Sequence, residues 1–498
     1  MRRLLLAAAL AAVPIVAQAQ TLRIAMNNDP DILDPTLSRT FVGTNVMTAI
    51  CDKLVDFDAK LTMIPGLATA WEYPDSKTIL LRLRPGVRFH DGEAFDAAAV
   101  KYTLDRHLTF SGSFRRAEIA AAERIEVVDP LTVRVVLKQP SAPWVAQLTD
   151  RSGMMISPKA AEAAGKDFGL HPVCAGPFRF TERVAQDHIT LDRFDAYWDK
   201  ANVHFDRVVY RPMTDSSVRL ANLQAGAVEI ADIVPTDADI VRKNPKLRLS
   251  TASGLGYTGL TLNIGNNPAA DTPLGRDPRV RQALSLSIDR DAVIGVVFAG
   301  LYTANAQPVA PDHPLYVAAH TPPRRDVARA RALLAEAGVK TPYAVKLMIP
   351  NSPQGVQVGE VVQSMAAEAG FAIQPVVMDF GTTLAASQKG DYQAFYIGWS
   401  GLLDTDSNVW SFLHSGAPLN TAQYSNLKVD ALLDQARETT DVITRRGLYA
   451  QVWAQESIDL PIIYLWSPRY ILGHTAGLDG FATMPDGIMR LRGVRLAP

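Results

Sequence analysis

The decisive stretch for the fold is Thr78-Ile79-Leu80-Leu81-Arg82-Leu83-Arg84-Pro85-Gly86. It predicts a β-strand that a Pro-Gly turn brings to an end. A helix is predicted from Asp96 to Arg106, and a further strand from Leu131 to Leu137, after the turn pair Asp129-Pro130. Because β-rich runs alternate with amphipathic helices, the pattern predicts a mixed α/β fold.

The C-terminal half repeats this alternation. Asp277-Pro278 predicts the start of a helix, because aspartate suits the cap and proline the first turn. Further helices are predicted over Asp326 to Gly338, Asn426 to Glu438 and Asp441 to Ser457, and the last two precede a predicted strand from Ile462 to Trp466.

The N-terminus has the order of a secretory signal. Two arginines follow Met1, then come an apolar run from Leu4 to Val16 and the small-residue segment Ala17-Gln18-Ala19. Residues 1–19 are therefore the predicted signal peptide, and the mature chain should begin near Gln20. No cysteine follows the cut, so we expect a periplasmic protein without a lipid anchor.

The length of 498 residues predicts more than one lobe, because single cores stop growing near ~250 to 300 residues. Asn, Gly, Pro and Asp cluster from Asn263 to Pro278, which predicts a crossing between lobes; a second crossing is expected near Arg469 to Thr475. The predicted domains are lobe I (20–264 plus 475–498) and lobe II (265–474). Beyond the signal, no apolar run approaches the ~18 residues of a membrane span.

Charge and cysteine content restrict the partners. The 50 Lys+Arg nearly balance the 51 Asp+Glu, which gives no reason to expect nucleic acid or an anionic membrane surface as a partner. Export would place Cys51 and Cys174 in an oxidising compartment, where pairing is allowed. A disulfide and two free thiols both stay open.

Two segments resemble cofactor-binding or catalytic motifs, but the neighbouring residues do not fit the motif. Gly254-Leu255-Gly256-Tyr257-Thr258-Gly259 matches a dinucleotide fingerprint, but the following residues predict a strand instead of the required helix. We therefore expect no cofactor. Gly398-Trp399-Ser400-Gly401-Leu402 lacks the last glycine of a nucleophile elbow, so a secreted serine hydrolase using Ser400 is the weakest alternative.

The nine histidines are dispersed and show no metal-ligand spacing, so no metal site is expected. A carrier of a metal chelate that uses a histidine such as His414 stays open as an alternative.

Candidate ligand contacts follow a predicted strand from Tyr392 to Trp399. It runs into a segment predicted to be irregular, which contains Ser400, Asp404 and Asp406, and ligand groups often project from such strand ends. A solvated acidic loop is the alternative. Arg115, Arg116 and Arg151 lie beside apolar residues and could clamp a carboxylate, although surface solubility explains them equally well.

Several segments together resemble the dipeptide and oligopeptide solute-binding family of ABC importers, which also contains nickel and glutathione binders. The resemblance is densest at Leu83-Arg84-Pro85-Gly86-Val87-Arg88-Phe89-His90-Asp91-Gly92. It continues in order through Phe95 to Tyr102, Ala175 to Phe178, Asp195 to Trp198, Arg219 to Gly226 and Val280 to Arg290. The matching segments extend over nearly the whole mature chain.

The resemblance implies a monomeric, non-enzymatic protein with the two-lobed type II periplasmic clamshell and an extra subdomain of lobe I near residues 72–170. Its partners would be a small solute and the ABC permease subunits of the inner membrane. The default ligand is a peptide or peptide-like solute. The rival is a carboxylate-rich solute such as glutathione, an opine-like conjugate or a metal chelate.

The resemblance also gives roles to the candidate contacts. Trp399 would stack on the ligand, Asp404 or Asp406 would meet a cation, and Arg115, Arg116 or Arg151 would meet a carboxylate, as in relatives with polycarboxylate ligands. Tyr257 and Ser400 complete the predicted contacts. Peptide binders of the family carry an aspartate just after this Gly-Trp, where this chain has Leu402 or, displaced, Asp404.

Overall fold

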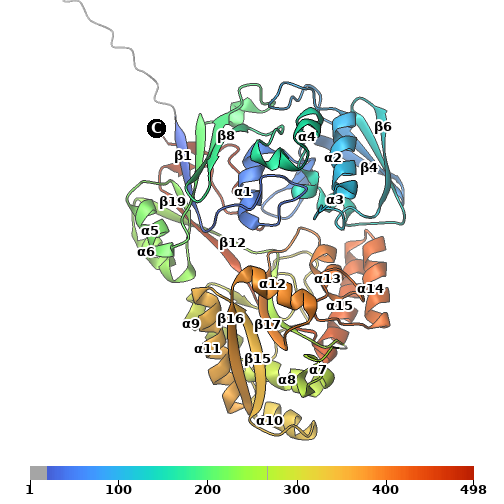
Figure 1. The fold of residues 1–498 in the computed structure, drawn as a ribbon, viewed down its shortest axis with the longest axis vertical. Coiled ribbons are helices and arrows are strands. Elements are labelled where there is room, and N and C mark those ends of the chain that lie inside the picture. The colour runs from blue at the N-terminus through green and yellow to red at the C-terminus, as the bar shows by residue number, and fades with distance from the viewer. Residues whose placement is uncertain (1–19, 266, 498) are drawn as a thin grey trace, which may run out of the picture.

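The computed structural model describes residues 20–265 and 267–497, so the predicted signal peptide (1–19) lies outside the described residues. Two lobes lie one above the other and are joined by strands that run between them (Figure 1). The predicted mixed α/β architecture is confirmed. Among the described helices, none combines the length and apolar character needed to cross a membrane.

Lobe I is built on a seven-stranded sheet in the order β12-β19-β11-β1-β10-β9-β8, counted over the described residues. Its centre is parallel, because β1 pairs in parallel with both β10 and β11, and the outer pairs are antiparallel. The strands are β1 (Thr21–Met26), β8 (Phe178–Val184), β9 (His188–Arg193), β10 (Arg207–Pro212), β11 (Ile230–Asp232), β12 (Leu247–Ser253) and β19 (Arg469–Thr475).

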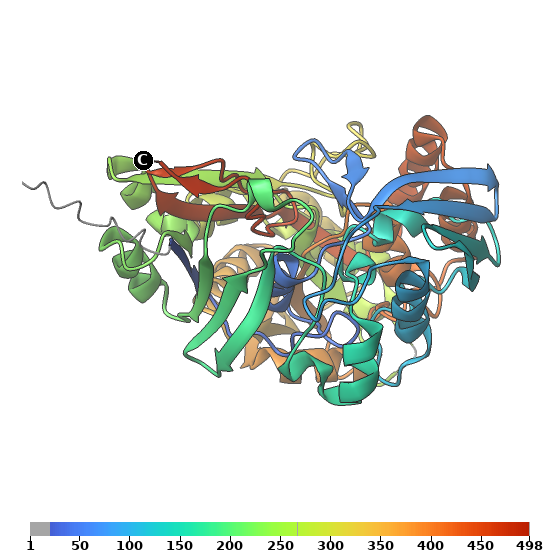
Figure 2. The same cartoon turned by 90° about the horizontal axis from the view of Figure 1, so that it is seen from above.

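An antiparallel sheet in the order β4-β5-β7-β6 forms the extra subdomain, at the opposite end of lobe I from the seven-stranded sheet (Figure 2). Its strands are β4 (Ala68–Asp75), β5 (Thr78–Leu83), β6 (Ala122–Asp129) and β7 (Thr132–Leu137). The strands predicted at Thr78 and Leu131 are thus β5 and β7. Alternate residues of β5, Ile79, Leu81 and Leu83, are buried beneath α2 in the core of this subdomain.

Lobe II contains a second large sheet, with the order β14-β18-β13-β17-β15-β16. Strand β15 pairs in parallel with β16 and β17, whereas β13 and β18 run antiparallel to their neighbours. The strands are β13 (Tyr257–Leu262), β14 (Thr303–Ala304), β15 (Tyr343–Pro350), β16 (Phe371–Met378), β17 (Ala394–Trp399) and β18 (Ile462–Ser467). Two small two-stranded sheets of lobe I pair β2 (Val55–Phe57) with β3 (Met63–Pro65) and β20 (Leu478–Asp479) with β21 (Arg495–Leu496).

Helices begin where the sequence supplies a capping side chain. The side chains of Asp96 and of the predicted caps Asp277 and Asp326 each accept a hydrogen bond from a backbone N–H in the first turn of a helix, and such a cap stabilises the helix by about 1 kcal/mol. The helices of lobe I are α1 (Phe41–Ile50), α2 (Ala97–Thr109), α3 (Trp144–Gln147), α4 (Pro158–Ala164), α5 (Ser216–Gln224) and α6 (Ala238–Lys243). Those of lobe II are α7 (Pro273–Arg276), α8 (Pro278–Ser287), α9 (Arg290–Phe298), α10 (Val327–Glu336), α11 (Pro353–Glu368), α12 (Phe380–Lys389), α13 (Thr405–Leu413), α14 (Leu427–Glu438) and α15 (Val442–Asp459).

The chain crosses between the lobes at other places than the predicted ones. Strand β12 belongs to the first sheet and β13 to the second, so the first crossing is Gly254 to Gly256; the return crossing is Pro468, between β18 and β19. The two crossings touch, because the Gly254 N–H donates to the Pro468 carbonyl oxygen at 2.8 Å. Residues 257–264 therefore lie with lobe II and 469–474 with lobe I, against the predicted boundaries.

The composition shift at Asn263 has a different role from a linker. The Asn263 side-chain amide donates to the carbonyl oxygens of Gly390 and Tyr392, both at 2.9 Å. These bonds tie the end of β13 to the start of β17 within one lobe. A polar cluster that satisfies backbone groups at a strand end has the same composition as a linker, which is why the sequence alone misplaced the crossing.

Cys51 and Cys174 form a disulfide bond in the structure, across a sequence separation of 123 residues. Both residues are fully buried in the core of lobe I. The bond joins the end of α1 to the segment that leads into β8.

Candidate ligand-binding site

The carboxyl ends of parallel strands meet at the edges where the two lobes face each other. In lobe II, β15, β16 and β17 end at Pro350, Met378 and Trp399. In lobe I, β1 and β11 end at Met26 and Asp232. Open α/β sheets bind ligands outside such ends, so the surface between the lobes is the candidate site.

Trp399 and Ser400 lie at the end of β17, as predicted. The Trp399 ring is half-buried, packs 5.2 Å from the Phe412 ring between centroids, and donates its indole N–H to the Asn408 Oδ1 at 2.9 Å. The indole is thereby held in one orientation, with part of its surface still open. Ser400 is exposed, and no histidine hydrogen-bonds it within the described residues. Nothing there activates its hydroxyl as a nucleophile.

The glycine-rich segment 254–259, which resembles a dinucleotide motif, forms the first crossing between the lobes and the start of β13. A Cβ at Gly256 would overlap the carbonyl oxygen of Trp399, and one at Gly259 would overlap that of Ile463. The glycines let the crossing segment and β13 lie against neighbouring backbone. The second half of segment 254–259 already belongs to strand β13, so the helix that a pyrophosphate needs is missing at this position.

The segment after Ser400 differs from the irregular loop that we predicted. Helix α13 begins at Thr405, and Asp404 is its cap, accepting the Asp406 backbone N–H at 2.9 Å. The sequence missed this helix because it is short and follows a Gly-Leu-Leu turn. The two predicted acids are thus placed by a helix N-terminus.

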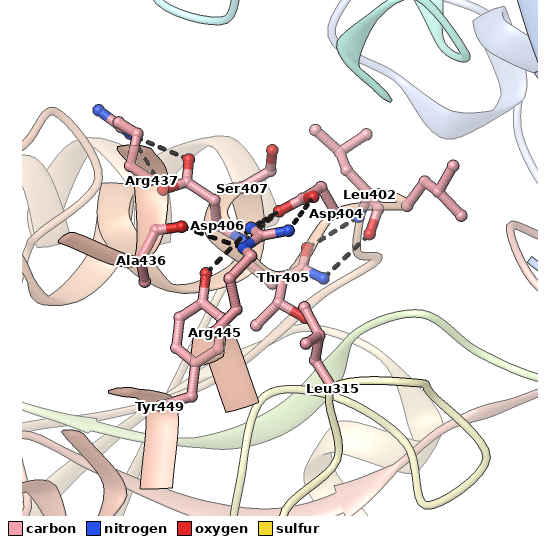
Figure 3. A network of polar contacts seen from close by, with 12 residues as sticks. Leu315, Leu402, Asp404, Thr405, Asp406, Ser407, Ala436, Arg437, Arg445 and Tyr449 are labelled. Atoms are coloured by element: carbon pink, nitrogen blue, oxygen red, sulfur yellow. Dashed lines mark hydrogen bonds and ion pairs between the residues drawn. The ribbon is translucent and has the colours of Figure 1, made fainter. Parts of the chain in front are cut away.

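Asp404 and Asp406 each hold an arginine of the protein (Figure 3). Asp404 accepts from Arg445 at 2.6 and 2.8 Å, and Asp406 accepts from Arg437 at 2.7 and 3.0 Å. Both carboxylates are largely buried. Each therefore has an internal cation as its partner, where the sequence led us to expect a ligand cation.

The pKa of Asp404 is lowered, whereas the pKa of Asp406 is raised. Burial acts to raise the pKa of Asp404, but the charge and hydrogen bonds of Arg445 outweigh it and the pKa is lowered. Burial raises the pKa of Asp406, and Arg437 only partly offsets this, because the neighbouring Asp404 charge opposes ionisation. The pair behaves as a structural ion network beside the site.

The three predicted arginines divide into two groups. Arg115 and Arg151 both donate to the Ser38 carbonyl oxygen, at 3.4 and 3.1 Å, and pair with Glu118 and Asp150 respectively. Arg116 is exposed and donates to the carbonyl oxygens of Leu108, Thr109 and Phe110 at the end of α2. Arg116 thus caps a helix and lies apart from the other two.

Arg115 and Arg151 support the loop in front of α1. Ser38 precedes Arg39, an exposed side chain that the sequence analysis did not select, whose guanidinium lies 4.9 Å from the Phe114 ring centroid. No ion pair to Arg39 occurs within the described residues. Burial lowers the pKa of Arg115, and the nearby Glu118 charge works against that shift.

Tyr257 lies in the core of lobe II, although we predicted it as a ligand contact. Its side chain is 3% exposed and packs edge-on against Tyr464 and Phe412, at centroid distances of 4.7 and 6.0 Å. Residue 257 begins β13, and the alternation of the strand turns this ring away from the lobe edge.

His414, the histidine of the metal-chelate alternative, stacks on Trp410 at 4.3 Å between ring centroids and lies 3.4 Å from an Asp434 oxygen. Within the described residues, no group of three His, Cys, Asp or Glu side chains is arranged to hold a metal ion.

A group of aromatic side chains between the lobes was missed by the sequence analysis. Tyr302 and Tyr396 come from lobe II, Tyr470 from β19 of lobe I, and all three are half-buried. Tyr470 stacks on Phe41, the first residue of α1, with ring centroids 5.4 Å apart. These tyrosines are far apart in sequence and form no motif, so they can be recognised as a group only from their positions in the folded structure.

Two cavities lie near these elements. One of about 280 Å³ borders the first crossing and is lined by residues of both lobes, including Leu61, Gly254, His313 and Pro485. None of the predicted contact residues lines it. Another of about 380 Å³ lies within lobe II between α8, α15 and β18.

Comparison with known proteins gives a consistent assignment. Residues 62–420 match the model of the bacterial extracellular solute-binding proteins, family 5 Middle. The chain is 33% identical to the glutathione-binding protein GsiB of Pectobacterium atrosepticum, over 96% of this chain and 94% of that protein. It is 32% identical to GsiB of Salmonella typhimurium, over 97% and 95% of the two chains.

Solved structures show the same architecture. The binding protein AgaA from A. tumefaciens R10, solved in complex with agropinic acid, has a TM-score of 0.85 and 26% identity, covering 96% of this chain and 99% of AgaA. The murein tripeptide binding protein MppA of Escherichia coli has a TM-score of 0.86 at 20% identity, over 97% and 99% of the chains, and supports the fold. The chain thus belongs to family 5 of the bacterial extracellular solute-binding proteins, the non-catalytic solute-binding components of ABC importers.

Proposed function

We propose that this protein captures a peptide-like solute between its two lobes in the periplasm and delivers it to the membrane permease of an ABC importer. The observation that carries the proposal is the end of β17, where the oriented, part-open Trp399 indole and the exposed Ser400 lie at the edge facing lobe I. A rigid aromatic surface binds a ligand at low entropic cost.

The corner around Ser38 supports a ligand that carries carboxylates. Arg115 and Arg151 fix the Ser38 carbonyl group, and the adjacent Arg39 keeps an exposed guanidinium without an ion pair among the described residues. Guanidinium groups bind carboxylates with two hydrogen bonds. Glutathione, the ligand in the names of the GsiB relatives, is both peptide-like and rich in carboxylates, and is the first solute to test.

Closure of the lobes is the step that would present the solute to the permease. Contacts already connect the lobes on the side of the extra subdomain, where the Gln147 side-chain amide donates to the Ser407 hydroxyl oxygen at 2.5 Å. A ligand that contacts both lobes adds to these interactions only in the closed state, and so shifts the population towards it.

Isothermal titration with glutathione, a set of dipeptides and an opine-like conjugate tests the proposal. We expect at least one solute to bind tighter than about 1 mM, that is, by more than about 4 kcal/mol. Trp399→Ala and Arg39→Gln should weaken that binding at least tenfold, about 1.4 kcal/mol. Arg116→Gln, which removes a guanidinium from the end of α2, is the matched control. Absence of any binder in this range would reject the proposed ligand class.

A further inference from the structure

Asp232 is an acidic side chain at the carboxyl end of β11 that keeps an open face. Its carboxylate meets Arg219 at 3.4 Å, but Arg219 gives its shorter bonds to the carbonyl oxygens of Met213 (2.7 Å), Thr214 (3.0 Å) and Asp232 itself (3.0 Å). The Asp232 side chain remains 33% exposed. Arg219 therefore ties two strand ends together. Burial raises the pKa of Asp232, and the Arg219 charge and a side-chain hydrogen bond from Asn27 only partly offset this rise.

Packing between the lobes brings Tyr302 to this carboxylate. Leu301 of lobe II packs against the apolar cluster of lobe I that contains Ile233, the residue next to Asp232. Helix α9, which precedes Leu301, also contacts the 3₁₀ turn at Pro235–Asp237. The neighbouring Tyr302 hydroxyl is close enough for the Asp232 charge to raise its pKa further, in addition to the rise that burial causes.

Two further tyrosines complete the group. Burial raises the pKa of Tyr470, and the nearby Asp486, Tyr302 and Asp232 add to this rise. Burial also raises the pKa of Tyr396, and the nearby Tyr302 adds to that rise. Each tyrosine ring packs against another aromatic ring. Tyr302 stacks on Phe298 and Tyr396 lies beside Trp466, with ring centroids 4.3 and 6.2 Å apart, and Tyr470 stacks on Phe41. We call Asp232, Tyr302, Tyr396 and Tyr470 the tyrosine cluster.

The cluster is suited to a positively charged group. None of the three tyrosine hydroxyls makes a hydrogen bond within the part of the chain that the structure describes, and none is sealed in the core. Arg469, the residue before Tyr470 in β19, points to the other face of the strand. Asp486, also near Tyr470, is paired with Arg490 at 2.9 Å. Aromatic rings and a carboxylate together attract ammonium groups.

We propose that the tyrosine cluster binds a cationic amine of the captured solute, with Asp232 as its counter-charge. The inference rests on the proposed function and deepens it: the solute carries a free amino group. Because the cluster draws on both lobes, an ammonium ion bound there would also favour closure.

The probes are glutathione and alanyl-alanine, each with a free amine and in its N-acetylated form, titrated calorimetrically at pH 7. The free-amine probe that binds should bind about tenfold or more tighter than its acetylated form, the scale of a charge-assisted hydrogen bond. Asp232→Asn should remove most of that difference. Asp239→Asn, an exposed acid on the nearby helix α6 that pairs with Arg242, should preserve it.

Stability is checked separately, by thermal melting of each variant. Asp232→Asn leaves the three main-chain bonds of Arg219 in place, so its melting temperature should match the parent within a few degrees. Tyr470→Phe, which removes only a hydroxyl, should weaken the free-amine probe and spare the acetylated one.

The outcomes separate the two proposals. Equal binding of free and acetylated forms, or an unchanged preference in Asp232→Asn, would overturn the amine site while the proposed function stands. Failure of every probe to bind the parent protein would reject the peptide-like ligand class, and the amine site with it.

Discussion

The Arg445 guanidinium holds both carboxylate oxygens of Asp404, with Nη2–Oδ1 and Nη1–Oδ2 distances of 2.6 and 2.8 Å (Figure 3). The same arginine donates to the Ala436 carbonyl oxygen at 3.0 Å and lies 3.4 Å from the Tyr449 hydroxyl oxygen. It thereby connects α15, the end of α14 and the cap of α13. The segment that carries Trp399 and Ser400 is anchored at this point.

Asp404→Asn should lower the free energy of unfolding by about 3 kcal/mol, because it leaves the Arg445 charge buried without a counter-charge. Urea unfolding measures this. Asp277→Asn is the matched control, since Asp277 also caps a helix and pairs with an arginine, but this arginine, Arg279, is exposed. About 1 kcal/mol or less is expected there. A loss of solute affinity in Asp404→Asn at unchanged stability would instead indicate direct ligand contact.

Glu456 should make the protein less stable as the pH rises. Its carboxyl is 1% exposed, and Oε1 has no hydrogen-bond partner in the described residues. Burial, and then the Asp459 charge, raise its pKa well above the ordinary value. The folded state thus keeps a proton that the unfolded chain releases above its ordinary pKa, and stability falls by up to about 1.4 kcal/mol per pH unit until the folded pKa is reached.

Glu456→Gln removes this loss, because an amide cannot ionise. Compared with the parent, the variant should gain stability at pH 8 and gain little at pH 4, as measured by urea unfolding across this range. Glu438→Gln, at the exposed end of α14, controls for the removal of one carboxyl group. A constant difference between parent and Glu456→Gln at all pH values would contradict the prediction.

Gln147→Ala should weaken solute binding about fivefold, because it removes the hydrogen bond to Ser407 that connects the lobes. Ser407→Ala should have a similar effect. The double variant should be hardly weaker than either single variant, since both remove the same interaction. Isothermal titration calorimetry of the parent, the two single variants and the double variant measures these affinities. Fully additive effects would show that the two side chains act on binding independently.

Replacing Cys51 and Cys174 by serine should lower the free energy of unfolding by about 2 to 5 kcal/mol, because the bond closes a loop of more than a hundred residues. Urea unfolding of the variant and of the reduced parent should give the same midpoint. Solute affinity of the folded variant should be retained, since both cysteines are buried in the core of lobe I. A midpoint of the variant equal to that of the oxidised parent would show that the bond contributes nothing to stability.

Local patterns in the sequence predicted the elements that depend on neighbouring residues. The caps Asp277 and Asp326 start helices as expected, because a cap bond spans two or three residues and needs no tertiary partner. The strand at Thr78 is also where its turn residues predicted it, and the strand predicted after Gly259 is present but begins at Tyr257.

Only the tertiary structure decided which charges are free. Asp404 and Asp406 are of a residue type and position typical of a ligand site. Arg445 and Arg437, more than thirty residues away, neutralise Asp404 and Asp406 respectively. Arg116 likewise became a helix cap through the position of the α2 carboxyl end. A side chain's availability depends on long-range partners, which spacing along the chain does not show.

By itself, the sequence determined that this chain is a two-lobed α/β solute-binding protein, since the segments carrying that information are local and follow one another in order. Tertiary packing decided where the chain crosses, how Trp399 is held, and that Leu301 of lobe II packs against the cluster of lobe I around Ile233. The physical reason is that a site between lobes is assembled from strand ends such as Met26, Asp232 and Trp399, which are far apart in sequence and whose side chains meet only after the sheets have formed.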